Sequence, residues 1–222
     1  MKNILPKLKK VALFYDISDE DILSLLQCLE AKKVQYLANQ VIFSQGEMVE
    51  LVGIVLSGNI QIIKDDFYGN RNIVSNVGEC ELFAEAFVCA NVEKMPVSVI
   101  STVKSEILLI NYKKLTTVCK STCGFHSKMV FNMLKILASK NVNITQKIDI
   151  LSKRTTKDKI LSYLYGEFQK NGRKIFEIPL NRQQMADFLF VDRSALSNEL
   201  AKLKKDGVID FNKNKFEIFN EE

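Results

Sequence analysis

The sequence predicts an α+β fold with an N-terminal β-sandwich or barrel, a long central helix, and a C-terminal pair of helices followed by a β-hairpin. Three observations lead to this prediction. Short β-branched runs with glycine-containing turns extend from about residue 34 to 110, a heptad pattern of apolar residues follows, and two short helical patterns then meet at residues 190 and 191. The predicted domain boundaries are 1–120 for the β-domain, 121–152 for the long helix and 153–222 for the C-terminal domain.

Length and composition place the chain among globular proteins with substantial hydrophobic cores. It has 222 residues, 47% of them hydrophobic, which is enough for one large domain or two small ones. No apolar run approaches the ~18 residues that span a bilayer, and the lysine-rich start is followed only by the short run "VALFY". We therefore expect a cytoplasmic protein with no membrane partner. The net charge of +5 is too small to identify a nucleic-acid binder by itself.

The first predicted element is a short amphipathic helix over residues 18–29. Ser18 and Asp21 have the spacing of a capping box, and four apolar residues then share one helical face. These are Ile22, Leu25, Leu26 and Leu29. Beyond it, runs such as "GIVLSGNIQII", "VSVIST" and "EILLI" alternate with turn signals, and five of the nine glycines fall in this stretch. Several short strands at such spacing indicate a β-sandwich or barrel.

A heptad seam marks a long helix from about 125 to 151. Its positions alternate in steps of four and three over about three heptads, a pattern that favours a parallel helix pair and hence a homodimer. A polar residue in such a seam, here Asn141, fixes register at a cost in stability. A long core helix lying on the barrel is the alternative. The seam consists of Val130, Leu134, Leu137, Asn141, Ile144, Ile148 and Leu151.

The C-terminal domain begins after a break at "LSKRTT". Thr155 and Asp158 cap a helix whose apolar face holds Ile160, Leu161, Leu164 and Phe168. "RKIFEIPL" then predicts a strand, and "VIDF-NKNK-FEIF" predicts a hairpin closed by an asparagine-rich turn.

Between that strand and the hairpin lie two short helices separated by a tight turn. Asn181 and Gln184 form a capping box for the first, whose inner face holds Met185, Ala186 and Leu189. Asp192 caps the second, and Gly207 ends it. If Leu196, Leu200 and Leu203 face inward, the opposite side is small and polar. That side holds Ser194, Ser197, Asn198 and Ala201, with Arg193 at its edge.

Such a helix pair can lay its first helix across a DNA backbone while the second enters the major groove. An αα-hairpin in an ordinary helical core is the alternative. The hairpin that follows favours DNA, because a helix pair with a β-wing is a winged helix-turn-helix. Its turn offers Lys213 and Lys215 to phosphates beside the groove.

This order of elements resembles the Crp/Fnr family of bacterial transcription regulators over almost the whole chain. The local anchors are "LSGNIQIIKD" and "GECELFAEAF" in the β-domain and "VDRSALSNELAKLKKDGVI" in the helix pair. The resemblance implies a β-roll of the cyclic-nucleotide-binding jelly-roll type that senses an effector, a dimerisation helix and a DNA-binding domain. It also implies a homodimer that binds an inverted-repeat site in double-stranded DNA, with RNA polymerase as a further candidate partner.

By position in the family, Arg193, Ser194, Ser197 and Asn198 are the residues that meet base edges. Better-known members commonly place glutamate where Ser194 stands and arginine where Asn198 stands, so the operator should differ from theirs. The turn glycine frequent in the family is replaced by Phe190, which we expect to pack under the turn.

The resemblance is weakest at the effector site. Members similar to the cyclic-AMP receptor hold the nucleotide through a glycine-glutamate pair and a later arginine, but Ala84-Glu85 and Met95-Pro96 occupy these places. A buried phosphate needs a charge-assisted partner, so we predict no response to cyclic AMP. The effector is unknown, no cofactor is predicted, and a mostly apolar ligand fits better. The predicted pocket is lined by Glu85, Ala86, Met95, Pro96, Val97, Ile144 and Thr145.

The sequence gives little support to other classes of function. Cys119, Cys123 and His126 stand at four- and three-residue steps, a candidate for metal, haem or redox sensing, but Gly124 interrupts them, and no metal is predicted. The five cysteines are an odd number at irregular spacing, which favours reduced thiols. No nucleophile motif or phosphate loop suggests an enzyme. A dimerisation protein without DNA activity is the remaining alternative.

Overall fold

The structure is a computed structural model that describes residues 2–65, 71–116 and 124–219. It divides into two compact units, Met1–Ser139 and Lys140–Glu222, which are described separately. The sequence analysis placed the domain boundaries at the two ends of the long helix, after residues 120 and 152. The contacts instead divide the chain inside this helix, between Ser139 and Lys140. The reason is packing, because Met129 and Met133 near the head of the helix are buried in the first core while Ile150 near its tail packs against the second.

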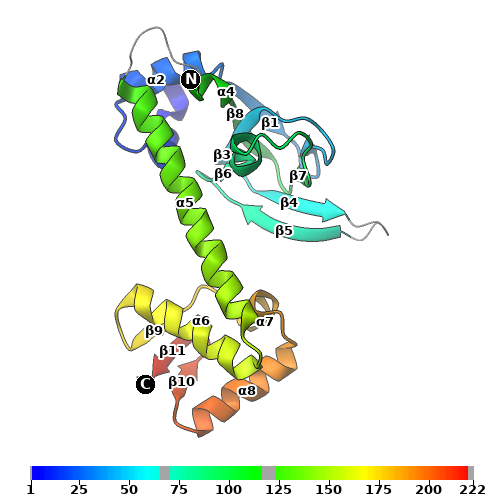
Figure 1. Ribbon diagram of the computed structural model, residues 1–222, viewed down its shortest axis with the longest axis vertical. Coiled ribbons are helices and arrows are strands. Elements are labelled where there is room, and N and C mark those ends of the chain that lie inside the picture. The colour runs from blue at the N-terminus through cyan, green and yellow to red at the C-terminus, as the bar shows by residue number, and fades with distance from the viewer. Residues whose placement is uncertain (1, 66–70, 117–123, 220–222) are drawn as a thin grey trace. The chain divides into compact units, whose positions relative to one another are not determined.

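The first unit consists of short helices followed by a β-roll (Figure 1). The segment before the roll contains two 3₁₀ turns, Lys2–Ile4 and Ala12–Phe14, and the helices α1 (Leu5–Leu8) and α2 (Asp19–Cys28). The strands of the roll are β1 (Lys32–Tyr36), β2 (Val41–Phe43), β3 (Leu51–Ser57), β4 (Ile60–Asp65), β5 (Arg71–Val77), β6 (Leu82–Phe83), β7 (Ser98–Ser101) and β8 (Ser105–Asn111). The helices α3 (Glu85–Cys89) and α4 (Lys113–Thr116) lie between or after the strands.

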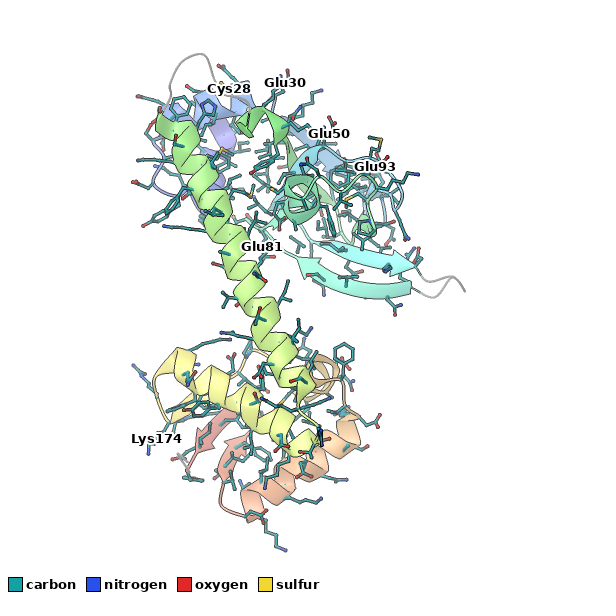
Figure 2. All side chains as sticks on the ribbon, in the orientation of Figure 1. Cys28, Glu30, Glu50, Glu81, Glu93 and Lys174 are labelled. Atoms are coloured by element: carbon teal, nitrogen blue, oxygen red, sulfur yellow. The ribbon has the colours of Figure 1, made fainter. Side chains whose placement is uncertain are left out.

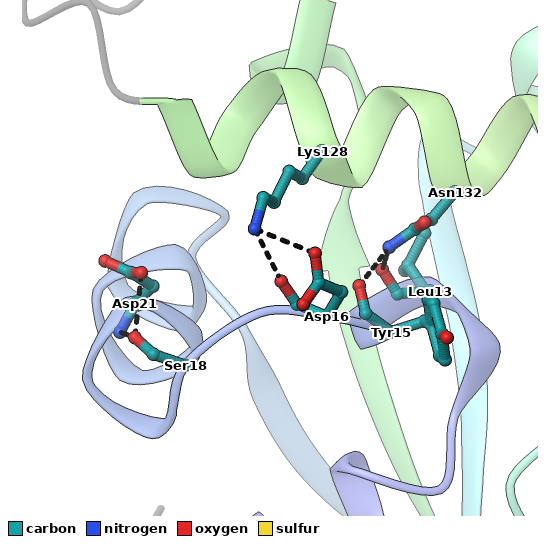
Figure 3. A network of polar contacts seen from close by, with 7 residues as sticks. All are labelled: Leu13, Tyr15, Asp16, Ser18, Asp21, Lys128 and Asn132. Carbon is teal, nitrogen blue, oxygen red and sulfur yellow. Dashed lines mark hydrogen bonds and ion pairs between the residues drawn. The ribbon is translucent and has the colours of Figure 1, made fainter.

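The strands form two antiparallel four-stranded sheets, in the orders β1-β8-β3-β6 and β2-β7-β4-β5. Side chains from both sheets join α2 in one core, so the predicted β-domain is confirmed. Gly53 permits this packing, since a Cβ built there would lie 2.0 Å from the Phe83 ring. The capping of α2 is also as predicted, because the Ser18 hydroxyl accepts from the Asp21 amide at 3.2 Å (Figure 3).

The long helix α5 spans Gly124–Ser152, close to the predicted range. Figure 3 shows how its head is held against the start of the chain. The Asn132 side chain, only 6% exposed, donates from Nδ2 to the carbonyl oxygens of Leu13 at 3.1 Å and Tyr15 at 2.8 Å. One turn earlier, Lys128 Nζ lies 3.0 Å from the Asp16 carboxylate. These contacts fix the rotation of α5 about its own axis in the first unit.

The second unit holds the predicted winged helix-turn-helix. Its elements are the tail of α5, α6 (Thr156–Asn171), β9 (Ile175–Glu177), α7 (Arg182–Leu189), α8 (Arg193–Lys205), β10 (Ile209–Asn212) and β11 (Lys215–Ile218). The three strands form one antiparallel sheet in the order β10-β11-β9. Thr155 caps α6 as expected, accepting from the Asp158 amide at 3.1 Å.

One local prediction in the second unit needs correction. Asp192 occupies the N-cap position of α8, but its side chain makes no capping hydrogen bond. The predicted asparagine-rich turn does close the hairpin, with Lys213 at φ +54° followed by Asn214. Among the described residues, no helix has the length and apolar character to cross a membrane.

Candidate nucleic-acid interface

Helix α8 presents the polar face that its sequence predicts. Leu196, Leu200 and Leu203 are at most 1% exposed and form part of the core of the second unit. The opposite side is exposed to solvent and consists of Arg193, Ser194, Ser197, Asn198 and Ala201. Small side chains there leave the helix slim, and the guanidinium and amide groups can each make two hydrogen bonds to a base edge.

Helix α7 is fastened at both ends. At its start, the Asn181 side chain accepts from the Gln184 amide and the Gln184 side chain accepts from the Asn181 amide, each at 2.9 Å. At its end, Lys159 of α6 donates to the carbonyl oxygen of Leu189 at 3.3 Å. This carbonyl belongs to the last turn of α7, where helical partners run out. The turn between the two helices therefore has a fixed geometry.

Phe190 does not pack under the turn, and that prediction is wrong. It is the C-cap of α7 in the left-handed conformation, with φ +53° and ψ +53°, and 72% of its surface is exposed. The backbone adopts the conformation that glycine usually supplies, and the side chain projects outward. A cation lies near the exposed ring, since Lys147 Nζ is 5.9 Å from the Phe190 ring centroid.

The wing places two lysines at its tip. Asn212 pairs with Lys215 across a two-residue turn, and both Lys213 and Lys215 are exposed. Neither forms an ion pair with another described residue. Two uncompensated cations beside a polar helix face suit phosphates that flank a groove.

Arg182 is a functional candidate that the sequence analysis missed. Its guanidinium lies 4.7 Å from the Phe211 ring and 5.0 Å from the Phe216 ring, so it joins the start of α7 to the wing. Burial lowers its pKa, and Nη1 has no hydrogen-bond partner among the described residues. The wing itself is tied to α8, because Lys204 pairs with Asp210 and holds the pKa of that carboxyl below its usual value. No local sequence signal joins residues so far apart.

The heptad seam of α5 is largely exposed on the single chain. Leu134, Ile144 and Ile148 are 62%, 58% and 61% exposed, and Val130 is 40% exposed. Asn141 is exposed as well, whereas Leu137 and Leu151 are half-buried. Asn132 and the two methionines face the first core, and Leu137 packs partly against it. The exposed seam residues form an apolar face that the described residues leave largely uncovered.

The residues of the predicted effector pocket divide between the two units. In the first, Glu85, Met95 and Val97 are buried at 3%, 3% and 6% exposure, while Ala86 and Pro96 are exposed. In the second unit, Ile144 and Thr145 line an open groove of about 910 Å³.

The segment that contains Met95 is tied to the β2–β3 loop. The Met95 amide donates to the Glu47 carbonyl at 2.9 Å, and the Met95 carbonyl accepts from the Gly46 amide at 2.8 Å. A pocket of about 200 Å³ in the same unit is lined by other residues, among them Glu50 and Glu93, labelled in Figure 2.

The cysteine-histidine candidate is only partly visible. Cys119 and Cys123 lie outside the described residues. His126 is in the first turn of α5, with Nδ1 buried and lacking a hydrogen-bond partner within the described ranges. Within those ranges no three potential ligands cluster around a metal position. Cys28, Cys80 and Cys89 are free thiols.

Two family models match the sequence. The cyclic nucleotide-binding domain matches residues 33–122, and the Crp-like helix-turn-helix domain matches residues 158–222. No curated protein matches the chain.

Several solved structures share the fold. Catabolite activator protein from Thermus thermophilus has a TM-score of 0.54 at 19% identity, covering 94% of this chain and 93% of that chain. CLP, the c-di-GMP responsive global regulator of Xanthomonas campestris, has a TM-score of 0.57 at 16% identity, covering 91% of this chain and 100% of that chain. CprK complexed with OCPA has 0.65 at 17%, covering 90% of each chain.

Proposed function

Because this chain belongs to the Crp/Fnr family of transcription regulators, we propose that it acts in the bacterial cytoplasm as a homodimer that binds specific sites in double-stranded DNA. The observation that carries the proposal is the outer face of α8, where Arg193, Ser197 and Asn198 are exposed while three leucines anchor the other side. A helix that serves only the core has no need of such a face. The proposal assigns the protein no catalytic step.

Dimerisation through α5 supplies the symmetry of the site. The exposed seam gives an apolar surface that a second copy can cover in the same way, as two-fold interfaces require. Two copies of α8 related by that axis bind two half-sites about one helical turn apart, roughly 10 bp, in inverted repeat. RNA polymerase is a further candidate partner in this proposal.

The protein does not respond to cyclic AMP in this proposal. Between Leu82 and Ile100 the sequence contains one cation, Lys94, which is exposed. Met95 stands where a phosphate-binding arginine is expected, and an apolar thioether cannot neutralise a buried phosphate. The similar structures differ in their ligands, since CLP is described as responsive to c-di-GMP and CprK as complexed with OCPA, so the shared fold leaves the effector open.

The test is a pair of substitutions measured on the same DNA fragments. Arg193→Ala should weaken binding by ~1–3 kcal/mol and relax selection at one base position, because an arginine contact to a base edge is lost. Lys213→Asn removes the proposed phosphate contact while keeping a residue type that tolerates positive φ. It should therefore weaken binding to all DNA sequences by the same factor and reduce the salt dependence of the affinity. If both variants lost affinity without any change in base preference, α8 would not be the recognition helix.

A further inference from the structure

The groove in the second unit is large enough to hold a small molecule. It lies between the tail of α5 and α6, with Phe188 of α7 contributing to its lining, and its volume is about 910 Å³. Volumes of this order are typical of ligand pockets in proteins. The aromatic residues Tyr163, Tyr165 and Phe188 line it together with Ile150 and Leu180. Tyr163 and Phe188 are in contact, with ring centroids 5.2 Å apart.

One charge in this groove lacks a counter-ion. Asp149 pairs with Lys153 at 3.0 Å, and Glu167 pairs with Lys170 at 2.9 Å. Lys147 is the remaining charged residue of the lining, and it forms no ion pair with any described residue. Its Nζ lies 5.0 Å from the Phe188 centroid. An ammonium held over an aromatic ring at an apolar groove is a site for one negative charge.

Gly166 supplies an independent observation. It lies inside α6, where glycine destabilises a helix by roughly 0.5–1 kcal/mol relative to alanine. A Cβ built on Gly166 would meet no atom within 4 Å, so nothing in the described chain requires its small size. It also lines the groove. The missing side chain therefore leaves this part of the groove open.

We propose that this groove binds an amphipathic organic monoanion, a carboxylate with a flat apolar body. The carboxylate accepts hydrogen bonds from Lys147 Nζ, and the apolar body lies between Gly166 and the aromatic lining. Such a ligand touches α5, α6 and α7 at once, so its binding is linked to how the second unit holds its helix pair. The groove is separate from the DNA-contacting face of α8. A failure of DNA binding would therefore not refute the ligand site, and a failure of ligand binding would not refute DNA binding.

The test is calorimetric titration of the full chain with 2-naphthoate, with uncharged 2-naphthamide as the matched ligand. We expect saturable binding of one naphthoate per chain and at least fivefold weaker binding of the amide. Lys147→Met should reduce naphthoate affinity about tenfold, which corresponds to about 1.4 kcal/mol. Lys135→Met is the matched control, because Lys135 also lies on α5 over a phenylalanine ring, at 4.7 Å from Phe131, but outside the groove. It should bind naphthoate as the unaltered chain does.

Gly166→Leu gives a variant in which loss of binding cannot be ascribed to misfolding. Leucine is the better helix former and enters open space, so the melting temperature should stay the same or rise while naphthoate binding disappears. Absence of naphthoate binding, equal effects of the two lysine variants, or full binding by a folded Gly166→Leu chain would each overturn the proposal. Ile144 belongs both to the seam and to the lining of the groove. If the second copy that covers the seam also filled the groove, naphthoate would not bind and Gly166→Leu would change the sedimentation of the protein.

Discussion

Replacing Leu134 by alanine tests the role of the seam. On the single chain 62% of Leu134 is exposed, so most of its apolar surface is free to be buried against a partner. Full burial of a leucine contributes about 1.5–3 kcal/mol, and the exposed share is roughly 1–2 kcal/mol. A two-fold dimer contains this contact twice. After allowing for the methyl group that alanine keeps, we expect a loss of roughly 2–3 kcal/mol per dimer, or about 30- to 150-fold in the dimer dissociation constant.

Sedimentation over a range of protein concentrations measures that constant. The matched control is Val142→Ala, because Val142 is 55% exposed on the same helix but lies outside the heptad seam. We expect the control to leave association unchanged. Equal weakening by both substitutions, or an unaltered protein that is monomeric at micromolar concentration, would refute the assignment of the seam.

Three further outcomes are expected. Asn141→Leu should tighten association while reducing its specificity, measured as mixed oligomers by native mass spectrometry, because an apolar residue replaces the polar group that fixes register. Asn132→Leu should lower the free energy of unfolding by roughly 1–3 kcal/mol in urea, since two backbone carbonyls lose their donor, and a change below 0.5 kcal/mol would show that the bonds are unimportant. Calorimetry with cyclic AMP and cyclic GMP should show no binding, and micromolar affinity for either would mean that another cation replaces the missing arginine.

Much of the architecture was predictable because its signals are local. The inward leucines of α8 and the cap of α7 each depend on residues within one or two helical turns. The β-roll follows from alternation and turns along the chain, and the exposed seam of α5 was visible as a heptad pattern.

The errors arise where a residue's environment depends on distant parts of the chain or on the backbone. Phe190 looked like a buried replacement for glycine, yet the left-handed turn fixes the backbone and leaves the ring outside. Arg182 acquires its role only when the β10–β11 hairpin folds back onto α7. The effector pocket stays a prediction: Ile144 and Thr145 were assigned to it as residues of the long helix that close the β-roll pocket, and within the second unit they line the groove beside α6.

Selection of bound sequences from a pool of randomised double-stranded DNA tests the central claim most directly. With the unaltered protein at physiological salt, the enriched sequences should contain an inverted repeat whose half-sites lie about 10 bp apart. The same selection with Arg193→Ala should lose preference at one position of each half-site. Enrichment of no sequence, or of a single unrepeated half-site, would contradict the account of a homodimer that recognises DNA through α8.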